Sequence, residues 1–214
     1  CQDVKELPAG TSSLDVCADH YHRYKEDIKL MAEMGFKTYR FSIAWTRLIP
    51  NGTGEVNQAG IDHYNDVINT CLEYNIEPLV TMFHFDMPDA LDKRGSWSNP
   101  ESVDWFVNFA KVMFENFGDR VKYWLTINEQ NMLTLVGPLI GTLRIPEGTT
   151  NVLKEVYQQN HHMLVAQAKA MVLCHEMLPN AKIGPAPNIS YVYPASCKPE
   201  DNLAALDYNA IRNW

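Results

Sequence analysis

Two hydrophobic periodicities alternate along the chain, one typical of amphipathic helices and one typical of buried strands. The helical segments repeat apolar residues every three or four positions, whereas the strand segments are short, nearly continuous apolar runs. The predicted strands span residues 37–45, 77–85, 121–128 and 181–188, and the predicted helices span residues 19–35, 60–75, 99–118, 152–178 and 200–214. This regular alternation predicts a parallel α/β sheet.

Several predicted helices carry recognisable boundary residues. Asp19 is a candidate N-cap of the first helix, and Gly35 is a candidate stop. The third helix has Asn99 as a cap, Pro100 at its first position and Gly118 after its end. The apolar faces predicted to pack are Val103, Phe106, Ala110, Met113 and Phe117 in the third helix, and Leu153, Val156, Met163, Gln167, Met171 and Leu178 in the fourth.

A parallel α/β chain of this kind folds either as a doubly wound sheet or as an eight-fold barrel. No glycine-rich fingerprint follows a predicted strand, which disfavours a dinucleotide-binding sheet. Polar residues gather instead at the carboxyl ends of the strands, where barrel enzymes build their sites: Arg40, His84, Asp86, Asn128 and Glu129. A complete barrel needs about 250 residues. We therefore expect residues 1–214 to be one partial catalytic (β/α)8 TIM barrel domain, with residues 1–17 as a loop before the first recognisable helix.

Composition and charge exclude several classes of partner. The chain is 46% hydrophobic and 21% charged with a net charge of −8, and no basic cluster marks a surface for nucleic acid or anionic membrane. No apolar run approaches the roughly 20 residues of a membrane helix. The first residues, CQDVKELPAGTSS, are polar and unlike a signal peptide, although the chain does not begin with Met. Five widely spaced cysteines without C-x-x-C favour reduced thiols over disulfides or zinc, and we expect a cytoplasmic protein.

Arg40 lies on a predicted strand whose two faces differ in character. Period two puts Tyr39 and Phe41 on one face and Arg40 on the other. Packing the large apolar face against helices turns Arg40 into the barrel lumen. A buried guanidinium requires a carboxylate or several other acceptors. The residues alone leave open whether Arg40 makes a structural ion pair or belongs to a functional site.

His84 and Asp86 follow the second predicted strand. Taken alone, they would be a hydrogen-bonded core histidine and an aspartate that caps the loop. Trp45 and Trp97 occupy loops after strands, where an indole can stack on a sugar ring, although packing is the commoner role of tryptophan.

Two histidine-rich stretches, residues 19–22 and 161–162, could suggest a metal site. Adjacent or alternate residues on a helix do not share a face, however, and so cannot converge on one ion. No metal site is predicted.

The sequence YWLTINEQN, residues 123–131, takes a buried strand to an amide beside a carboxylate. One interpretation is a helix cap, with Asn128 ending the strand and Glu129 in the first turn that follows. Because adjacent strand residues point to opposite faces, both side chains can reach one site only where the strand ends or bulges. An apolar wall that includes Trp124 would favour the protonated carboxyl that a general acid needs. With an amide to hold a substrate hydroxyl, the pair suits acid-assisted cleavage of a sugar acetal.

Four longer segments stand in order from about Cys17 to the end of the chain: YHRYKEDIKLMAEMGFKTYRFSIAWTRLIPNGTGEVNQAGIDHYNDVI, PLVTMFHFDMPDAL, WSNPESVDWFVNFAKVMFENFGDRVKYWLTINEQN and KIGPAPNISYVYP. Together they resemble family 1 glycoside hydrolases, the β-glucosidases, β-galactosidases and 6-phospho-β-glycosidases. The resemblance implies an eight-stranded (β/α) barrel, of which this chain holds about four strands, the second to the fifth. It also implies retaining hydrolysis through a covalent glycosyl–enzyme.

The resemblance also assigns roles to the residues at the strand ends. Glu129 matches the acid/base, and Asn128 matches the amide that holds the sugar 2-hydroxyl. His84 matches a sugar-binding histidine, and Arg40 matches an arginine that positions the nucleophile. Gln130 stands where the family usually has proline. Asp86 is given a structural role.

These roles imply a retaining β-glycosidase that acts on β-glucosides or related β-glycosides, 6-phosphorylated ones included, without a cofactor. The family's nucleophile has no counterpart here, so we expect it to lie outside this chain and the fragment alone to be inactive. The expected partners are a small-molecule or oligosaccharide β-glycoside, the missing C-terminal half of the barrel and, through unpaired sheet edges, a second copy in a homo-oligomer. The alternative is a non-catalytic relative that binds a sugar or a protein with the same fold. A doubly wound oxidoreductase or transferase is disfavoured.

Overall fold

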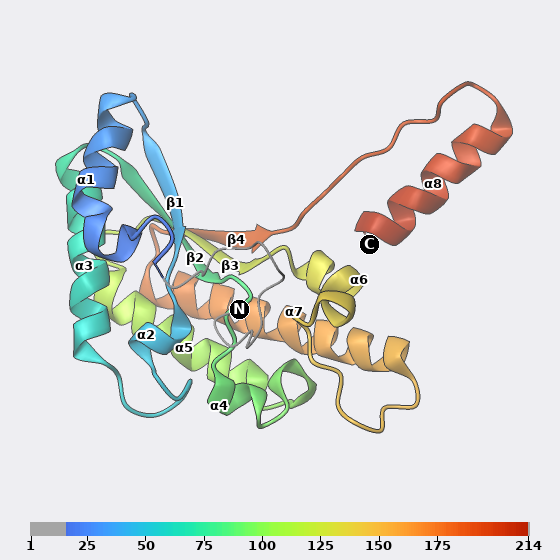
Figure 1. The fold of residues 1–214 in the computed structure, drawn as a ribbon, viewed down its shortest axis with the longest axis horizontal. Coiled ribbons are helices and arrows are strands. Elements are labelled where there is room, and N and C mark those ends of the chain that lie inside the picture. The colour runs from blue at the N-terminus through green and yellow to red at the C-terminus, as the bar shows by residue number, and fades with distance from the viewer. Residues whose placement is uncertain (1–15, 214) are drawn as a thin grey trace.

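The computed structural model describes residues 16–213, which are built around a four-stranded parallel sheet (Figure 1). The strands are β1 (Thr38–Ser42), β2 (Glu77–Phe83), β3 (Tyr123–Asn128) and β4 (Lys182–Ala186). They lie in the order β1-β2-β3-β4, each parallel to its neighbour. Each strand falls within a predicted segment, so the strand pattern is confirmed. Most of the predicted loop at 1–17, including Cys1, lies outside the described residues.

Five longer helices confirm the predicted helical segments. They are α1 (His20–Glu33), α3 (Gln58–Glu73), α5 (Ser102–Phe117), α7 (Val152–Met177) and α8 (Pro199–Asn213), and the short elements between them are α2 (Trp45–Leu48), α4 (Asp89–Asp92) and the 3₁₀ turn η1 (Ser96–Ser98). A further helix, α6 (Gln130–Ile140), follows β3 and was not predicted. Its sequence contains Gly137 and Pro138, two residues that normally disfavour a helix interior. No helix within residues 16–213 is long and apolar enough to cross a membrane.

Helices pack on one face of the sheet and leave the other open among the described residues. Figure 1 shows α5 and α7 running below the sheet, and α1 and α3 pack against Tyr39 and Phe41 of β1. On the covered face, Val80 and Met82 of β2 are fully buried. On the other face, Arg40 of β1 is exposed. A doubly wound sheet carries helices on both faces, so this one-sided packing is that of a barrel wall.

The covered side holds an aromatic core beneath the carboxyl ends of the strands. Trp45 stacks on Phe109 of α5 with ring centroids 4.5 Å apart, and Trp97 meets Phe83 edge-on at 5.5 Å. The indole N–H of Trp45 donates to the carbonyl of Gly52. Both tryptophans are therefore packing residues, and the sugar-stacking role considered for them is not supported.

The predicted face of α5 is confirmed, whereas that of α7 is confirmed only in part, since Met171 and Leu178 are half-buried. All five residues of the predicted α5 face are buried. In α7, Val156, Met163 and Gln167 are buried, but Leu153 is 67% exposed. The 26 residues of α7 span about 39 Å at 1.5 Å per residue. This is longer than the strands that α7 covers, so its first turn projects beyond the sheet, as Figure 1 shows.

The residues predicted to start or stop helices fulfil these roles to different degrees. Gly35 takes a left-handed backbone after α1 with φ 84°, as a stop should. Asp19 precedes α1, but its carboxylate accepts from the His22 ring at 2.6 Å and from no backbone N–H of the helix, so the predicted N-cap bond is wrong. The Asn99 side chain accepts from the Glu101 N–H at 2.9 Å just before α5.

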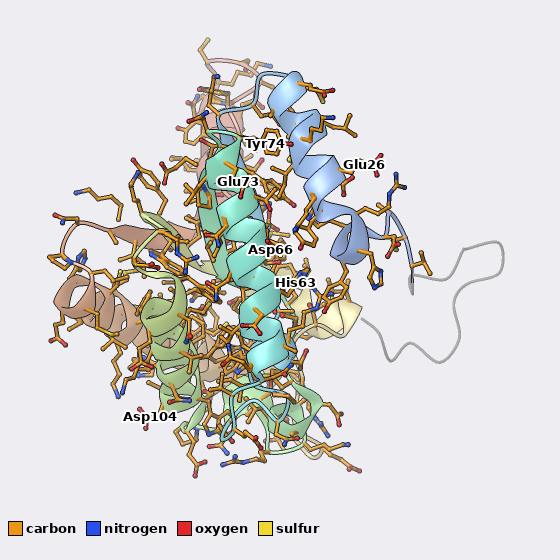
Figure 2. The ribbon with its side chains drawn as sticks, turned by 90° about the vertical axis from the view of Figure 1, so that its left-hand side faces the viewer. Glu26, His63, Asp66, Glu73, Tyr74 and Asp104 are labelled. Carbon is orange, nitrogen blue, oxygen red and sulfur yellow. The ribbon has the colours of Figure 1, made fainter. Side chains whose placement is uncertain are left out.

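A titratable cluster joins α1 to α3, the two helices that lie side by side in Figure 2. The His63 ring of α3 stacks on Tyr21 of α1 with centroids 4.2 Å apart, and the Arg47 guanidinium lies 4.5 Å from the centre of the same tyrosine ring. Asp66, one turn along α3, accepts from the Tyr24 hydroxyl. Burial, aided by the positive charge of Arg47, lowers the pKa of His63 to about 4.

This depressed pKa makes stability depend on pH. Between about pH 6.5, where a histidine titrates in the unfolded chain, and about pH 4 for native His63, the unfolded state gains a proton that the folded state does not. The free energy of unfolding should therefore fall as pH drops through that range. His63→Phe keeps the aromatic stack without the titration and should lose less stability between pH 7 and pH 5 in urea unfolding. The exposed His161→Phe serves as the control, and an unchanged pH dependence in His63→Phe would refute the assignment.

Candidate active site

The end of β3 departs from regular strand geometry. The register between β3 and β4 shifts between Leu125 and Asn128: Leu125 pairs with Gly184, but Asn128 pairs with Ala186. Over this segment β3 therefore has one residue more than β4. Glu129 then adopts a left-handed backbone with φ 43°, and its N–H donates to the carbonyl of Ala186 at 2.8 Å. The requirement that the strand end or bulge before both side chains can reach one site is met.

Asn128 links Arg40 and His84 across three strand ends. The Arg40 guanidinium donates from Nη2 to Asn128 Oδ1 at 2.5 Å and from Nε to Thr81 Oγ1 at 2.9 Å. The Asn128 amide nitrogen lies 3.1 Å from His84 Nε2. Because the amide oxygen receives the arginine, the amide nitrogen must donate, and His84 Nε2 must carry a lone pair.

Arg40 differs from its prediction in burial and in its partners. It lies on the lumen face as predicted, but it is exposed rather than buried. No carboxylate of residues 16–213 forms an ion pair with its guanidinium within 4 Å. The reason is geometric, because the described residues place nothing opposite the open face of the sheet. An amide and a hydroxyl serve as acceptors instead.

The Glu129 carboxylate lies beside the same cluster. Its Oε1 accepts from the Asn188 amide nitrogen at 2.7 Å. Its negative charge also acts on His84, opposing the effects that lower the pKa of that imidazole. Trp124 does not wall this carboxylate, contrary to prediction. It pairs with Val80 of β2, and its ring points to the covered face and meets Phe114 of α5 at 5.2 Å.

Asp86 braces the backbone around this cluster. Its Oδ2 accepts from the Trp45 N–H at 3.1 Å, and its Oδ1 accepts from the His84 N–H at 3.2 Å. Burial raises the pKa of its carboxyl. Asp86 therefore ties the end of β2 to the start of α2, in keeping with a structural role.

Sequence reasoning missed a buried amide network behind Glu129. The Gln130 side chain donates to Asn160 of α7 at 2.6 Å and accepts from Gln167 of the same helix. Gln167 in turn accepts from the Thr126 hydroxyl at 2.5 Å. These bonds anchor the first residue of α6 to α7 and β3. The only signal in the sequence was that Gln130 replaces the proline usual in the family.

The neighbouring histidines considered for a metal site point to different partners. His20 contacts Asp27 at 2.6 Å, whereas His22 contacts Asp19. His162 is buried against the carbonyl of Trp97. Within residues 16–213, no group of three or more His, Cys, Asp or Glu side chains is arranged to hold a metal ion.

Comparison with known proteins agrees with this fold. The family model for glycosyl hydrolase family 1 matches residues 1–213. The chain belongs to glycosyl hydrolase family 1. Among similar family 1 proteins, beta-glucosidase A of Thermotoga maritima is 44% identical over 203 residues, which are 94% of this chain and 44% of that protein. The 6-phospho-beta-glucosidase AscB of Escherichia coli K12 is 49% identical over 191 residues, which are 88% of this chain and 40% of that protein.

A solved family 1 structure matches the fold as well. The β-glucosidase of Thermotoga maritima in complex with glucoimidazole superposes with a TM-score of 0.82 at 44% identity, covering 92% of this chain and 44% of that one. The chain thus spans about half the length of the curated relatives it matches. The four strands are part of a (β/α)8 barrel, as predicted.

The Arg40–Asn128–His84 chain leads to a test by titration. Desolvation, aided by the positive charge of Arg40, lowers the pKa of His84 below 6.5. Arg40→Gln should therefore raise the pKa of His84, measured from its imidazole resonances by NMR, whereas Arg144→Gln at a distant exposed pair should not. The neutral ring should carry its proton on Nδ1. An unchanged His84 pKa in Arg40→Gln, or a proton on Nε2, would contradict the described geometry.

Proposed function

We propose that this chain is part of a retaining β-glycosidase that hydrolyses β-glucosides or 6-phosphorylated β-glucosides by double displacement. The observation that carries the proposal is the meeting of Arg40, Asn128 and His84 beside Glu129 at the carboxyl ends of β1 to β3. Barrel enzymes place their chemistry at this edge. Similar proteins named beta-glucosidase and 6-phospho-beta-glucosidase support both substrate classes.

In this mechanism Glu129 first protonates the leaving group and later activates water. Glu129 is half-buried at the end of β3, and its contact with Asn188 leaves one carboxylate oxygen available for the proton. Asn128 holds the sugar 2-hydroxyl, and His84 holds a neighbouring hydroxyl. Both side chains can form hydrogen bonds with hydroxyl groups.

Arg40 is proposed to position the nucleophile. A guanidinium has five N–H donors, and the Thr81 and Asn128 bonds occupy two of its nitrogen atoms. The third nitrogen can therefore donate to a carboxylate from the opposite wall of the barrel. Retaining hydrolysis needs that second carboxylate about 5 Å from the first. Asp86 is a poor candidate because both of its oxygens accept backbone N–H groups. The nucleophile is thus proposed to lie outside this chain, and inactivity of the isolated chain remains an expectation.

The rest of the barrel is the proposed partner of the open surface. In the order β1-β2-β3-β4, the outer edges of β1 and β4 have no neighbouring strand among residues 16–213. The C-terminal half of a barrel would pair with both edges and cover the lumen face. Pairing of two copies into a homo-oligomer is the alternative use of the same edges.

The buried thiols of Cys71 and Cys174 fit a reducing compartment such as the cytoplasm.

The acid role of Glu129 can be tested with leaving groups of different quality in the complete enzyme that carries this sequence. In Glu129→Gln, the glycosylation rate for an alkyl β-glucoside should fall by about 10²–10⁴-fold. A nitrophenyl β-glucoside releases nitrophenolate, which departs without protonation, so the glycosylation rate for this substrate should fall much less. Rates from single-turnover kinetics give the comparison, with the exposed Glu147→Gln as the control. Equal losses for both substrates would show that Glu129 is not the acid.

A further inference from the structure

Asn188 occupies a place opposite Glu129 for which the proposed mechanism assigns no role. It lies two residues beyond β4, at the same edge of the sheet as the site. Its amide nitrogen donates to Glu129 Oε1 at 2.7 Å, the one side-chain hydrogen bond found for that carboxylate among the described residues. The residue that holds the proposed acid/base therefore lies in the segment after a different strand, β4.

The orientation of the Asn188 amide is fixed by a charge. Arg212 of α8 donates from Nη2 to Asn188 Oδ1 at 2.6 Å and from Nη1 to the Asn188 carbonyl at 3.1 Å. An arginine has no acceptor atom, so the amide oxygen must face it and the amide nitrogen must face Glu129. Figure 1 shows how this is possible, since α8 returns beside α6 at the end of a long connection.

The position of the Asn188 backbone is fixed by a second side chain. Asn131 Oδ1 accepts from the Asn188 N–H at 3.0 Å, and Asn131 Nδ2 donates to the Asn188 carbonyl at 2.7 Å. Asn131 lies two residues after Glu129 in the first turn of α6. Asn188 is consequently held rigidly against the same turn that carries the carboxylate.

From this arrangement we infer that Asn188 is a positioning residue for Glu129, a conclusion that rests on the proposed glycosidase function. Its N–H occupies Oε1 and directs Oε2 toward the glycosidic oxygen. The same bond stabilises the carboxylate that must form when the proton is given to the leaving group. No new bond is made or broken in the reaction, because Asn188 acts only by holding the acid/base.

Three variants of the complete enzyme test this inference. Asn188→Ala should lower kcat for an alkyl β-glucoside by about 10- to 100-fold, the loss typical of a hydrogen bond to a charged group, with little change in KM. Asn188→Asp keeps the shape but places a second carboxylate opposite Glu129, so that a proton is retained between the two. Its alkaline limb of kcat/KM against pH should therefore move to higher pH. Asn209→Ala is the matched control.

The control removes a similar clamp without touching the site. Asn209 of α8 accepts from the Val192 N–H at 2.9 Å and donates to the Val192 carbonyl at 2.8 Å. Loss of this clamp should leave kcat and the pH profile unchanged. If Asn188→Asp kept the wild-type profile while Glu129→Gln showed its leaving-group dependence, the positioning role would be refuted and the proposed function would stand. If Glu129→Gln lacked that dependence, the proposed function itself would fail.

Discussion

The break in alternation at the end of β3 is the constraint on which the site depends. A regular strand would send Asn128 and Glu129 to opposite faces of the sheet. The shifted register after Leu125 and the left-handed backbone at Glu129 prevent this separation. A left-handed non-glycine residue costs about 1–2 kcal/mol, and the bond from the Glu129 N–H to Ala186 offsets part of that cost. The Gln130 network then holds the turn from behind, where the family usually has proline.

Two permanent charges, Arg40 and Arg212, fix the orientation of the polar groups in the site. Arg40 is always protonated and can only donate. The Asn128 oxygen must therefore face the guanidinium, and the Asn128 nitrogen must face His84. The same charge helps to keep His84 neutral. A second arginine, Arg212, imposes the same logic on Asn188 and through it on Glu129. Two amides, each oriented by a guanidinium, thus present their nitrogens to the two groups proposed to handle sugar and proton.

Periodicity and strand-end position were enough to predict much of this arrangement. The four strands, the five longer helices and the gathering of Arg40, His84, Asn128 and Glu129 follow from short-range patterns that a sequence displays directly. Two other features depend on residues distant in the chain and could not be foreseen. The ring of Trp124 turns away from the site and packs against Phe114 of α5. Asn188 meets Glu129 only because β4 lies beside β3. The helix α6 was missed because Gly137 and Pro138 conceal a segment that tertiary contacts with α7 stabilise.

Rescue by azide in the complete enzyme would test most directly whether Glu129 serves as acid/base opposite a separate nucleophile. In Glu129→Ala, an activated aryl β-glucoside should still form the glycosyl–enzyme, but water would lack its base. Azide can enter the space left by the carboxylate and attack the sugar from the side that the leaving group vacated. The expected product is β-glucosyl azide, formed faster as azide is added. An α-glucosyl azide would identify Glu129 as the nucleophile, and absence of any acceleration would remove it from the chemistry.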